Sequence, residues 1–469
     1  MLPMVGHLSR FERKGQDAPL LAGRRMGLLI SLSLAVLCLG IALGASTSSA
    51  SNLRELPSSL DADICGPIST NATWTEAQSP VTVTCDTALL PGVTLEIEPG
   101  VEVRFTAGVS LTISGTLDAT GLAGQPITLT SGLETPAPGD WAGLRFVAGS
   151  SDSNLDWCVV EYATIGVHVH ARPGDTVSPT FSDCTVRHHS QHGFKVEGFA
   201  RACDEALAEP TIAGCTVEHN GGCGIFGHGH GDPIDVCSLP NGGGVGGVVS
   251  GSRIQQNQGS GICLESELDG LGRGDVWIGL DANVISGNAG HGVHLYGDDP
   301  VHHPRIENNL IYGNAGTGIQ TDAKHEETEL FVVNNTVVDN GGDGMVFNRS
   351  ALQVHLTNNI VFDNDGCGLV CNGAEDPQAT HNDLWLNAGG DYNGCTPGIS
   401  DISADPLLLD PAAGNFRLSF GSPCIDAGTS TGAPATDFEG IVRPQGDGVD
   451  IGAHELWYQR IFLPVTLRE

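Results

Sequence analysis

The stretch Asn309-Leu-Ile-Tyr-Gly-Asn-Ala-Gly-Thr-Gly-Ile319 decides how this chain folds, because its pattern recurs along the sequence. In each copy an Asn, Cys or Ser is followed five positions later by Asn or His and nine positions later by Gly, and then by an apolar residue. A fixed phase of this kind is the signature of a repeat architecture. The copies begin at Cys184, Cys215, Ser252, Asn283, Asn309, Asn335 and Asn359, and a slightly shorter copy begins at Cys158.

Each copy is built for strands and not for helices. It holds about two apolar stretches of strand length, separated by Asn-x-Gly-x-Gly, in which Gly and Asn tolerate positive φ. No copy has room for the crossover helix of a βαβ fold, so successive copies must stack as parallel coils at the strand spacing of roughly 4.8 Å. Equivalent side chains then lie above one another, and the first column forms a ladder of hydrogen-bonded Asn amides. We therefore predict an all-β fold in which the ladder asparagines and the leading Cys158, Cys184 and Cys215 are structural.

This pattern resembles that of the right-handed parallel β-helix superfamily, which includes pectate-lyase-like and NosD-like proteins. Segments 91–105 and 139–146 look like the first coils of its secreted members. Segments 405–411, 421–428 and 437–455 look like the ending of exported β-helix proteins that carry a choice-of-anchor C-terminal region. The resemblance implies a right-handed single-stranded parallel β-helix, a solenoid of about 12 coils, located outside the cell or on its surface.

Four segments follow from the repeat and the resemblance. They are a signal peptide (1–50), an N-terminal cap with the first coils (51–150), the β-helix repeats (151–390), and C-terminal coils with a cap (391–469). The tail that follows Trp457 is either a sorting signal or a last strand.

Charge limits the partners of the protein. Its 469 residues include 21 Lys and Arg against 55 Asp and Glu, which gives a net charge of −34. We expect no binding to nucleic acid, and an anionic polysaccharide would need bridging cations. We expect a monomer whose partner is a polysaccharide.

The first 50 residues predict export. Arg24 and Arg25 precede an apolar run from Met26 to Gly44, and small residues follow it up to Ala50, which is the order of a cleavable secretory signal. The alternative is an uncleaved membrane anchor, because the run approaches spanning length. Contact with a membrane is expected only through such an anchor or through C-terminal sorting.

Export permits disulfides. After removal of the signal 13 of the 14 cysteines remain, so at least one thiol lacks a partner within the chain. The plausible pairs are Cys65 with Cys85, Cys395 with Cys424, and Cys203 with Cys237.

A candidate site lies on the outward face of the early repeats. The second and fourth residues after each repeat Gly are expected to point outward, and there they are rich in His and ionisable side chains. Glu197 and Glu265 fall two coils apart, about 9–10 Å between backbones, with His228 between them. This is near the separation of roughly 6.5–9.5 Å between the carboxylates of inverting glycosidases. The predicted catalytic residues are Glu197, His228, Glu265, Lys195 and Arg187, and the predicted substrate-binding residues are His168, His170, His294 and Tyr296.

A lyase or epimerase would use these residues differently. Lys195, Arg187 or His228 would remove the proton next to a uronate carboxylate, and Arg or Ca²⁺ would have to neutralise that carboxylate. The segment Glu265-Ser-Glu-Leu-Asp269 and Asp275 offers oxygen ligands that suit Ca²⁺. If the protein is an enzyme, we thus expect a polysaccharide lyase or a glycoside hydrolase.

Two other functions fit the same residues. The His and Glu side chains could be only solvated cross-strand pairs on a non-catalytic surface adhesin or scaffold. The pairs His168/His170 and His228/His230 share a strand face at i and i+2 and suit Zn²⁺ or Cu²⁺, as in a metal-binding, NosD-like exported protein. The residues leave the choice among these functions open.

Overall fold

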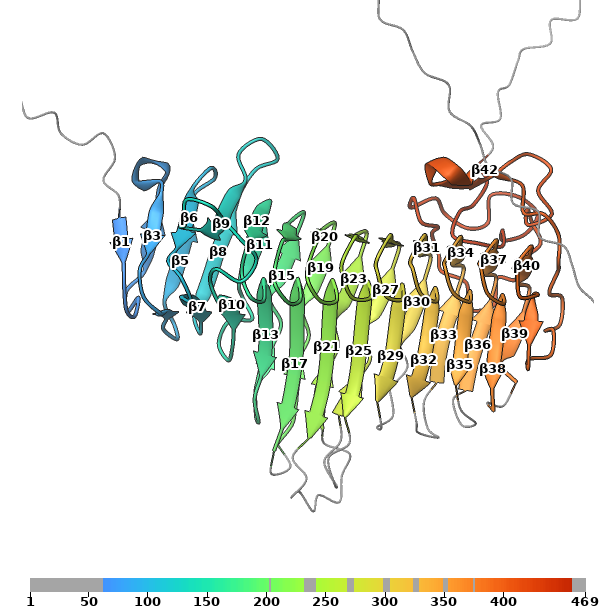
Figure 1. Cartoon of the computed structure of the whole chain (residues 1–469), viewed down its shortest axis with the longest axis horizontal. Helices are drawn as coiled ribbons and strands as arrows, with labels where there is room; N and C mark the ends of the chain where they lie inside the picture. Colours follow the sequence, from blue (N-terminus) through green and yellow to red (C-terminus); the bar gives the residue numbers. More distant parts are fainter. Residues whose placement is uncertain are drawn as a thin grey trace, which may run out of the picture. The chain divides into compact units, whose positions relative to one another are not determined.

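The computed structural model describes residues 62–201, 204–231, 242–267, 274–297, 304–323, 329–348, 353–373 and 376–457. Within these residues the chain winds through three long parallel sheets, here called sheets A, B and C. A coil visits sheets C, A and B in turn (Figure 1). The predicted parallel β-helix of about 12 coils is confirmed, with three strands per coil where the sequence predicted about two.

The strands of sheet A, in spatial order, are β1 (Ala62–Ile64), β3 (Val81–Val83), β6 (Glu102–Phe105), β9 (Ile127–Ser131), β12 (Cys158–Glu161), β16 (Thr185–Arg187), β20 (Thr216–Glu218), β24 (Arg253–Gln255), β28 (Val284–Ser286), β31 (Leu310–Tyr312), β34 (Thr336–Val338), β37 (Ile360–Phe362) and β40 (Asp383–Trp385). Those of sheet B are β4 (Thr87–Leu89), β7 (Ser110–Ile113), β10 (Gly143–Phe146), β13 (Val167–Ala171), β17 (Phe194–Ala200), β21 (Ile225–Gly231), β25 (Ile262–Glu267), β29 (Val293–Gly297), β32 (Ile319–Ala323), β35 (Met345–Asn348), β38 (Leu369–Asn372) and β41 (Tyr392–Asn393). Those of sheet C are β2 (Ala72–Trp74), β5 (Thr94–Ile97), β8 (Thr116–Thr120), β11 (Asn154–Asp156), β15 (Thr180–Ser182), β19 (Thr211–Ala213), β23 (Val248–Ser250), β27 (Gly279–Asp281), β30 (Arg305–Glu307), β33 (Glu329–Val333), β36 (Gln353–Thr357) and β39 (Gln378–Thr380).

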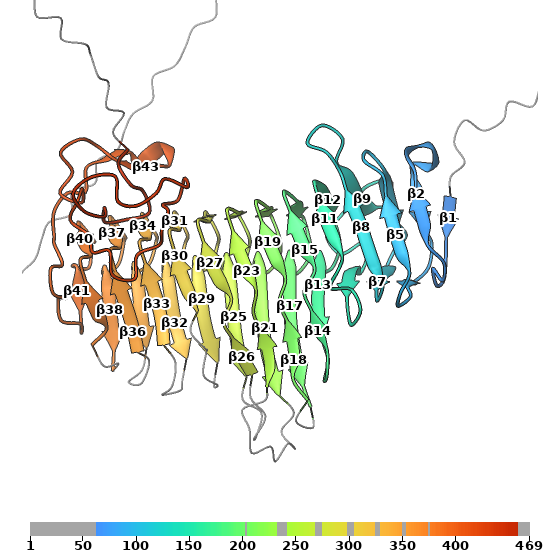
Figure 2. The same ribbon diagram turned by 180° about the vertical axis from the view of Figure 1, so that it is seen from behind.

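A shorter parallel sheet extends four of the coils. Its strands are β14 (Thr176–Val177), β18 (Ala206–Ala208), β22 (Gly243–Val245) and β26 (Gly274–Val276), and each follows a strand of sheet B (Figure 2). An antiparallel pair, β42 (Leu408–Asp410) and β43 (Asn415–Leu418), and two short 3-10 turns, η1 (Glu76–Gln78) and η2 (Pro411–Ala413), complete the regular structure of the described residues. None of the described helices has the length and apolarity that crossing a membrane requires, and the apolar run 26–44 lies outside these residues.

The predicted Asn ladder is present where sheet C turns into sheet A. The Nδ2 of Asn309 donates to Asn335 Oδ1 (3.0 Å) and to the Leu280 carbonyl (2.9 Å), and its backbone N–H also donates to Asn335 Oδ1 (2.9 Å). The same bonds recur from Asn283 to Asn359. The leading thiols take the place of the amide, because Cys184 Sγ donates to the carbonyl of Leu155 on the preceding coil (3.3 Å). These residues are buried and structural, as predicted.

A second ladder lies where sheet A turns into sheet B. It runs through Asn220, Asn257, Asn288, Asn314, Asn340, Asn364 and Asn387, whose amides bond from coil to coil at 2.9–3.0 Å. In both ladders the residue just before the ladder position has positive φ, for example Asn308 (55°) and Gln256 (55°). The positive φ angles are therefore found at the residues before the ladder positions. The repeat glycines, for which the sequence predicted positive φ, do not have it. A Cβ on Gly261 would lie 2.8 Å from the Gly292 carbonyl and 2.9 Å from Asn288 Nδ2, so Gly is needed there for close approach of the coils.

His189 replaces Asn at the head of the second ladder. Its backbone N–H donates to Asn220 Oδ1 (3.1 Å), and its Nδ1 accepts from the Ala163 N–H (3.0 Å). Burial lowers the pKa of His189 to about 3, so its ring is neutral in the folded protein.

The stability of the protein should therefore fall in weak acid. Below the ordinary His pKa of about 6.5 the unfolded chain binds a proton on His189 that the folded chain excludes. Between pH 6.5 and pH 4.5 this lowers the free energy of unfolding by roughly 2–3 kcal/mol. We expect His189→Asn to flatten the dependence, as measured by urea unfolding at both pH values. If the free energy of unfolding fell by the same amount between pH 6.5 and pH 4.5 in both proteins, this assignment would be contradicted.

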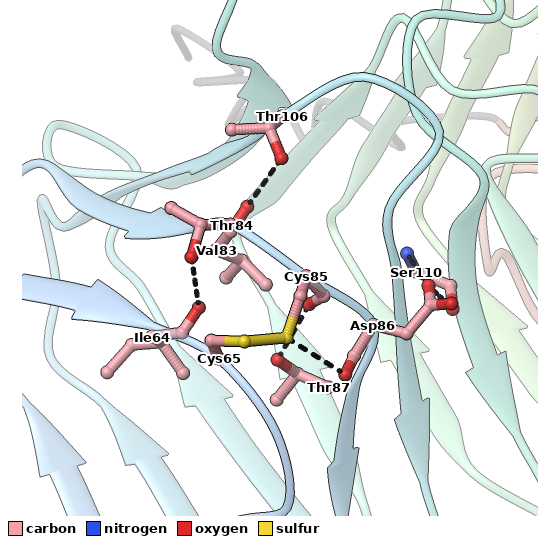
Figure 3. The surroundings of a disulfide bond; sticks show 9 residues. All are labelled: Ile64, Cys65, Val83, Thr84, Cys85, Asp86, Thr87, Thr106 and Ser110. Atoms are coloured by element: carbon pink, nitrogen blue, oxygen red, sulfur yellow. Dashed lines mark hydrogen bonds between the residues drawn. A yellow bond between two sulfur atoms is a disulfide. The ribbon is translucent and has the colours of Figure 1, made fainter.

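Disulfides join neighbouring coils. The predicted Cys65–Cys85 bond is confirmed, and Figure 3 shows it beside the hydrogen bond from Thr84 Oγ1 to the Ile64 carbonyl. The predicted pairing of Cys395 with Cys424 is wrong. Cys395 bonds to Cys371, and Cys424 is a buried thiol that donates to Asp383 Oδ2 (3.1 Å). A third bond, Cys223–Cys263, was not predicted, and the pair Cys203 and Cys237 lies outside the described residues. Disulfides are typical of exported proteins, in agreement with the predicted export.

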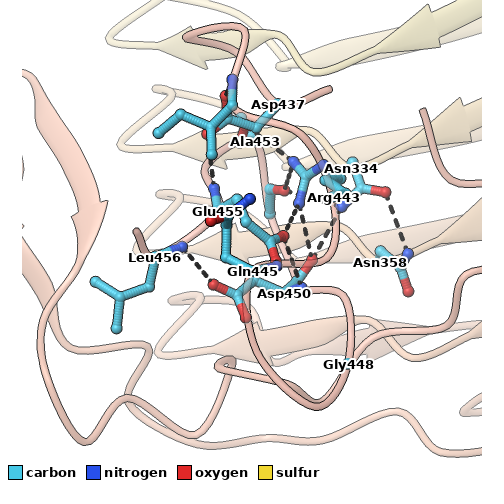
Figure 4. A network of polar contacts seen from close by, with 12 residues as sticks. Asn334, Asn358, Asp437, Arg443, Gln445, Gly448, Asp450, Ala453, Glu455 and Leu456 are labelled. Carbon is cyan, nitrogen blue, oxygen red and sulfur yellow. Dashed lines mark hydrogen bonds and ion pairs between the residues drawn. The ribbon is translucent and has the colours of Figure 1, made fainter. Parts of the chain in front are cut away.

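The chain after β41 folds back over the outer surface of sheet A. Phe416 and Ala453 pack on Val284, Leu310 and Val338, which point outward from β28, β31 and β34. Leu418, Cys424 and Ile451 cover Ile360 of β37 in the same way. We call residues 408–456 the C-terminal cover; Figure 4 shows its polar centre at Arg443. The boundaries of the four predicted segments, and the role of the tail, stay predictions.

Candidate functional site

The outward face of sheet B is formed by alternating side chains. In β17, Phe194 and Val196 are buried, and Lys195 and Glu197, which alternate with them, reach the surface. The same alternation is present in β13. The predicted facing of these side chains is thus confirmed. The register places the fourth residues of successive strands side by side, in the order His170, Glu197, His228, Glu265, Tyr296 and Asp322.

Glu197 is surrounded by nitrogen atoms. His168 Nε2 lies 3.0 Å and His170 Nδ1 lies 2.9 Å from its Oε2, and Lys195 Nζ lies 2.9 Å from its Oε1. Although burial favours the neutral acid, these partners hold the pKa of Glu197 far below its usual range. Glu197 therefore cannot donate a proton at neutral pH, which argues against a role for it as the acid of the predicted pair.

A similar cluster follows two coils later. His228 Nε2 and His230 Nδ1 each lie 3.0 Å from Glu267 Oε2, and His228 Nδ1 lies 3.6 Å from Glu197 Oε1. Burial opposes the charged imidazole of His228, but Glu197, Glu265 and Glu267 outweigh it and raise its pKa. The sequence placed Glu267 only in the segment of candidate Ca²⁺ ligands and did not predict its pairing with His228 and His230. The signal was a carboxylate in register with the second His of a His-x-His strand, as Glu267 is with His230.

A groove adjoins this cluster. It has a volume of about 440 Å³ and is lined by Glu265, Ser266, Glu267, His294, Tyr296, Gly297 and Asp322. His294 Nε2 lies 2.8 Å from Asp322 Oδ2, and the Tyr296 hydroxyl donates to Glu265 Oε2 at 3.5 Å. Burial and the neighbouring Glu265 raise the pKa of Tyr296 to about 12, so its hydroxyl remains a donor. The predicted residues Glu265, His294 and Tyr296 are thus brought together.

Arg187 does not join the other predicted residues. It lies on β16 of sheet A, where its guanidinium pairs with Glu161 at 2.9 Å. Arg187 precedes the turn between sheets A and B, whereas Lys195 follows it, so the two side chains belong to different sheets. Of the proposed Ca²⁺ ligands, Glu265 lies on β25 and Asp275 on β26 of the shorter sheet, and Asp269 lies outside the described residues.

A second cavity, of about 660 Å³, lies on sheet C and was not predicted. Arg305, Phe331 and His355 stack across β30, β33 and β36 along its wall, with the Phe331 and His355 rings 4.7 Å apart. Thr429 and Thr431 of the C-terminal cover close one side. This cavity depends on how the cover folds back, for which the repeat pattern holds no signal.

Comparison with known proteins supports the fold. Residues 174–384 match the family model of the right handed beta helix region, and residues 66–168 match that of the pectate-lyase like beta helix domain. No curated protein matches the chain.

Three solved structures illustrate the likeness. One is pectate lyase Pel9A, with 16% identity, a TM-score of 0.45, and coverage of 76% of this chain and 88% of that chain. Another is the periplasmic alginate epimerase AlgG, with 14% identity, a TM-score of 0.37, and coverage of 69% and 75%. A third is the A-module of the Azotobacter vinelandii mannuronan C-5 epimerase AlgE4, with 13% identity, a TM-score of 0.36, and coverage of 74% and 89%.

Both family-model matches end before residue 385, so the choice-of-anchor ending stays a prediction. The matches cover the coils that carry sheets A, B and C, and with the parallel register of these sheets they make the chain a right-handed parallel β-helix repeat protein.

Proposed function

We propose that this protein works outside the cell and binds a neutral or amino-sugar polysaccharide in the groove on sheet B. The observation that carries the proposal is the lining of the groove, which combines the carboxylates of Glu265, Glu267 and Asp322 with the aromatic side chain of Tyr296. Carboxylates accept hydrogen bonds from sugar hydroxyls, and an amphipathic aromatic ring can pack on a sugar while its hydroxyl donates.

The charge of the groove argues against a uronate. Three carboxylates line it, and the chain carries a net charge of −34. Lys195 and Arg187, the two cations among the predicted catalytic residues, are already paired with Glu197 and Glu161. This favours neutral sugars, or amino sugars whose ammonium groups the carboxylates would attract.

Hydrolysis is a second candidate function, favoured by the placement of Glu265 and Asp322. The two residues occupy the same strand position two coils apart, with Tyr296 between them, so their backbones are about 9–10 Å apart. This suits the spacing of roughly 6.5–9.5 Å in an inverting glycosidase. Burial opposes ionisation of Asp322, but donors on Asn348, His294 and Gln320 lower its pKa, which suits the base. Hydrolysis would then require Glu265 to supply the proton to the glycosidic oxygen.

Retention on polysaccharide gels tests the binding. We expect the purified protein to be retarded in gels that contain neutral or amino-sugar polysaccharides, and not in gels that contain polyuronate. Tyr296→Ala should weaken retention about tenfold, the equivalent of ~1.4 kcal/mol. Glu102→Gln, which alters an exposed carboxylate on β6, is the matched control and should bind like the parent. Stronger binding to polyuronate, or equal retention of the two variants, would contradict the proposal.

The same polysaccharides separate binding from hydrolysis. New reducing ends that disappear in the double variant Glu265→Gln/Asp322→Asn, while retention persists, would assign hydrolysis to these carboxylates. Retention without new reducing ends would assign binding alone.

A further inference from the structure

Two clusters on sheet B repeat the same arrangement of atoms. In each, a strand carries His-x-His, and a Glu of the following strand lies in register with the second His. The first His approaches through Nε2 and the second through Nδ1, and both nitrogens lie 2.9–3.0 Å from the same carboxylate oxygen, Oε2. The first cluster consists of His168, His170 and Glu197, and the second consists of His228, His230 and Glu267.

Cross-strand pairing alone does not account for this geometry. An ordinary cross-strand pair is seen on sheet C, where His355 Nε2 lies 2.9 Å from Glu329 Oε1. In the two clusters a pair of imidazoles converges on one oxygen. Their three ligand atoms all lie within 4.8 Å of one another, close enough for small side-chain movements to bring them around a single ion. The stacked strands hold this spacing, because each His pair is anchored on one backbone and each Glu on the next.

We propose that the two clusters bind two divalent transition-metal ions of the kind that imidazole prefers, Zn²⁺ or Cu²⁺. Two imidazole nitrogens and one carboxylate oxygen form a donor set that both ions accept. Three protein ligands leave a coordination position for water or for a ligand of the protein, as in open metal sites. This inference does not depend on the proposed polysaccharide binding.

The surroundings of the clusters predict that the second binds more tightly. A ligating His normally donates its other ring N–H to an acceptor, which fixes the ring and strengthens the metal bond. In the second cluster, His228 Nδ1 faces an acceptor, because Glu197 Oε1 lies 3.6 Å away, slightly beyond hydrogen-bond distance. In the first cluster, His170 Nε2 faces a donor instead, because Arg172 Nε lies 3.3 Å away. The ammonium of Lys195, 2.9 Å from Glu197, further opposes a cation there.

Metal binding can be measured directly and without any polysaccharide. The purified full chain would be stripped with a chelator and dialysed against Zn²⁺ or Cu²⁺, and the bound metal would be quantified by atomic emission. We expect two equivalents with different affinities, and nitrogen hyperfine structure in the electron paramagnetic resonance spectrum of the Cu²⁺ form. The ion that binds more tightly under competition identifies the preferred metal.

Single variants assign the two sites. His230→Gln should abolish the tighter metal equivalent and His170→Gln the weaker one. In each variant the metal affinity should fall by more than the 10–100-fold that is lost when only a hydrogen-bond partner of a ligand is removed. The control His355→Gln removes the single His of the pair on sheet C and should keep both equivalents. Arg172→Gln should tighten the weaker site by about 10–100-fold, because an amide oxygen can accept the proton of His170. A misfolded variant could not show such a gain.

The proposal is overturned if the parent protein retains neither ion after dialysis, or if the double variant His170→Gln/His230→Gln retains two equivalents. It is also overturned if His355→Gln loses as much metal as His230→Gln. Failure of polysaccharide binding would leave these results unchanged, so the two proposals can fail separately.

Discussion

Replacing Asn314 with alanine is expected to destabilise the protein by about 3 kcal/mol or more. The Asn314 side chain accepts from the backbone N–H (3.1 Å) and the amide (2.9 Å) of Asn288, and it donates to the Ile285 carbonyl (3.0 Å). These three groups are buried and would lose a partner together, at roughly 1–3 kcal/mol each. Urea unfolding measures the loss as a lower midpoint at unchanged slope.

Asn372→Ala is the matched control for this change. Asn372 also stacks on an Asn of the preceding coil, since its Nδ2 donates to Asn348 Oδ1 (2.8 Å), but this amide is exposed to water. Its loss should change the free energy of unfolding by no more than ~0.5 kcal/mol. Equal losses in the two variants would show that burial adds nothing to the ladder and would contradict our account of it.

Replacing Arg443 with methionine is expected to cost about 3–5 kcal/mol, because it leaves a buried carboxylate without its cation. The side chains of Arg443 and Glu455 are each 1% exposed, and Arg443 Nη1 lies 2.8 Å from Glu455 Oε2. The guanidinium also donates to the carbonyl of Gly452 at 3.0 Å and to that of Ala453 at 3.0 Å, the latter labelled in Figure 4. It therefore ties together the part of the C-terminal cover that packs on sheet A.

The damage from Arg443→Met should be local. We expect the cover to detach and expose Val284, Leu310 and Val338, which would raise the binding of a hydrophobic dye and direct limited proteolysis to residues 408–456. The control Arg417→Met breaks the exposed pair with Glu439 and should leave the proteolysis pattern unchanged, since such pairs contribute roughly 0–1 kcal/mol. Cleavage inside the coils before the cover would contradict the assignment.

The coils were predictable because every copy repeats the same spacing. The ladder residue comes at or just before the start of the sheet A strand of each copy, and the repeat Gly comes just before the sheet B strand. These fixed positions made the strands of sheets A and B predictable. Sheet C was missed as a separate strand because it precedes the ladder residue, in the part of each copy whose length varies. The Cys371–Cys395 bond had a signal in the coil register, since β38 pairs with β41 and Val370 lies opposite Asn393. The cover has no repeat, and its packing on sheet A could not be predicted.

The candidate site was predicted in part for the same reason. Strand alternation and register placed Glu197, His228, Glu265 and Tyr296 on one face, as the structure confirms. The pairing of Glu267 was missed because the second cluster is displaced by two residues along the strand relative to the first. The state of Glu197 depends on four side chains that converge from three coils, and linear spacing does not reveal such convergence. The catalytic and binding roles stay proposals.

The two ladders have a consequence for how such a protein can change in size. Every ladder bond joins nearest neighbours, so the loss of one coil upstream of β28 would bring the next ladder residue into equivalent bonds, as the successive bonds of Asn220 to Asn257 and of Asn257 to Asn288 show. Upstream of β28, whole coils can thus be gained or lost, because the coils that become neighbours make the same kind of contact as before. From β28 to β37 they cannot, because the C-terminal cover spans these strands and fits only their present number. The cover therefore fixes the number of coils beneath it, and the outward face of sheet B can be lengthened only by adding coils before β28.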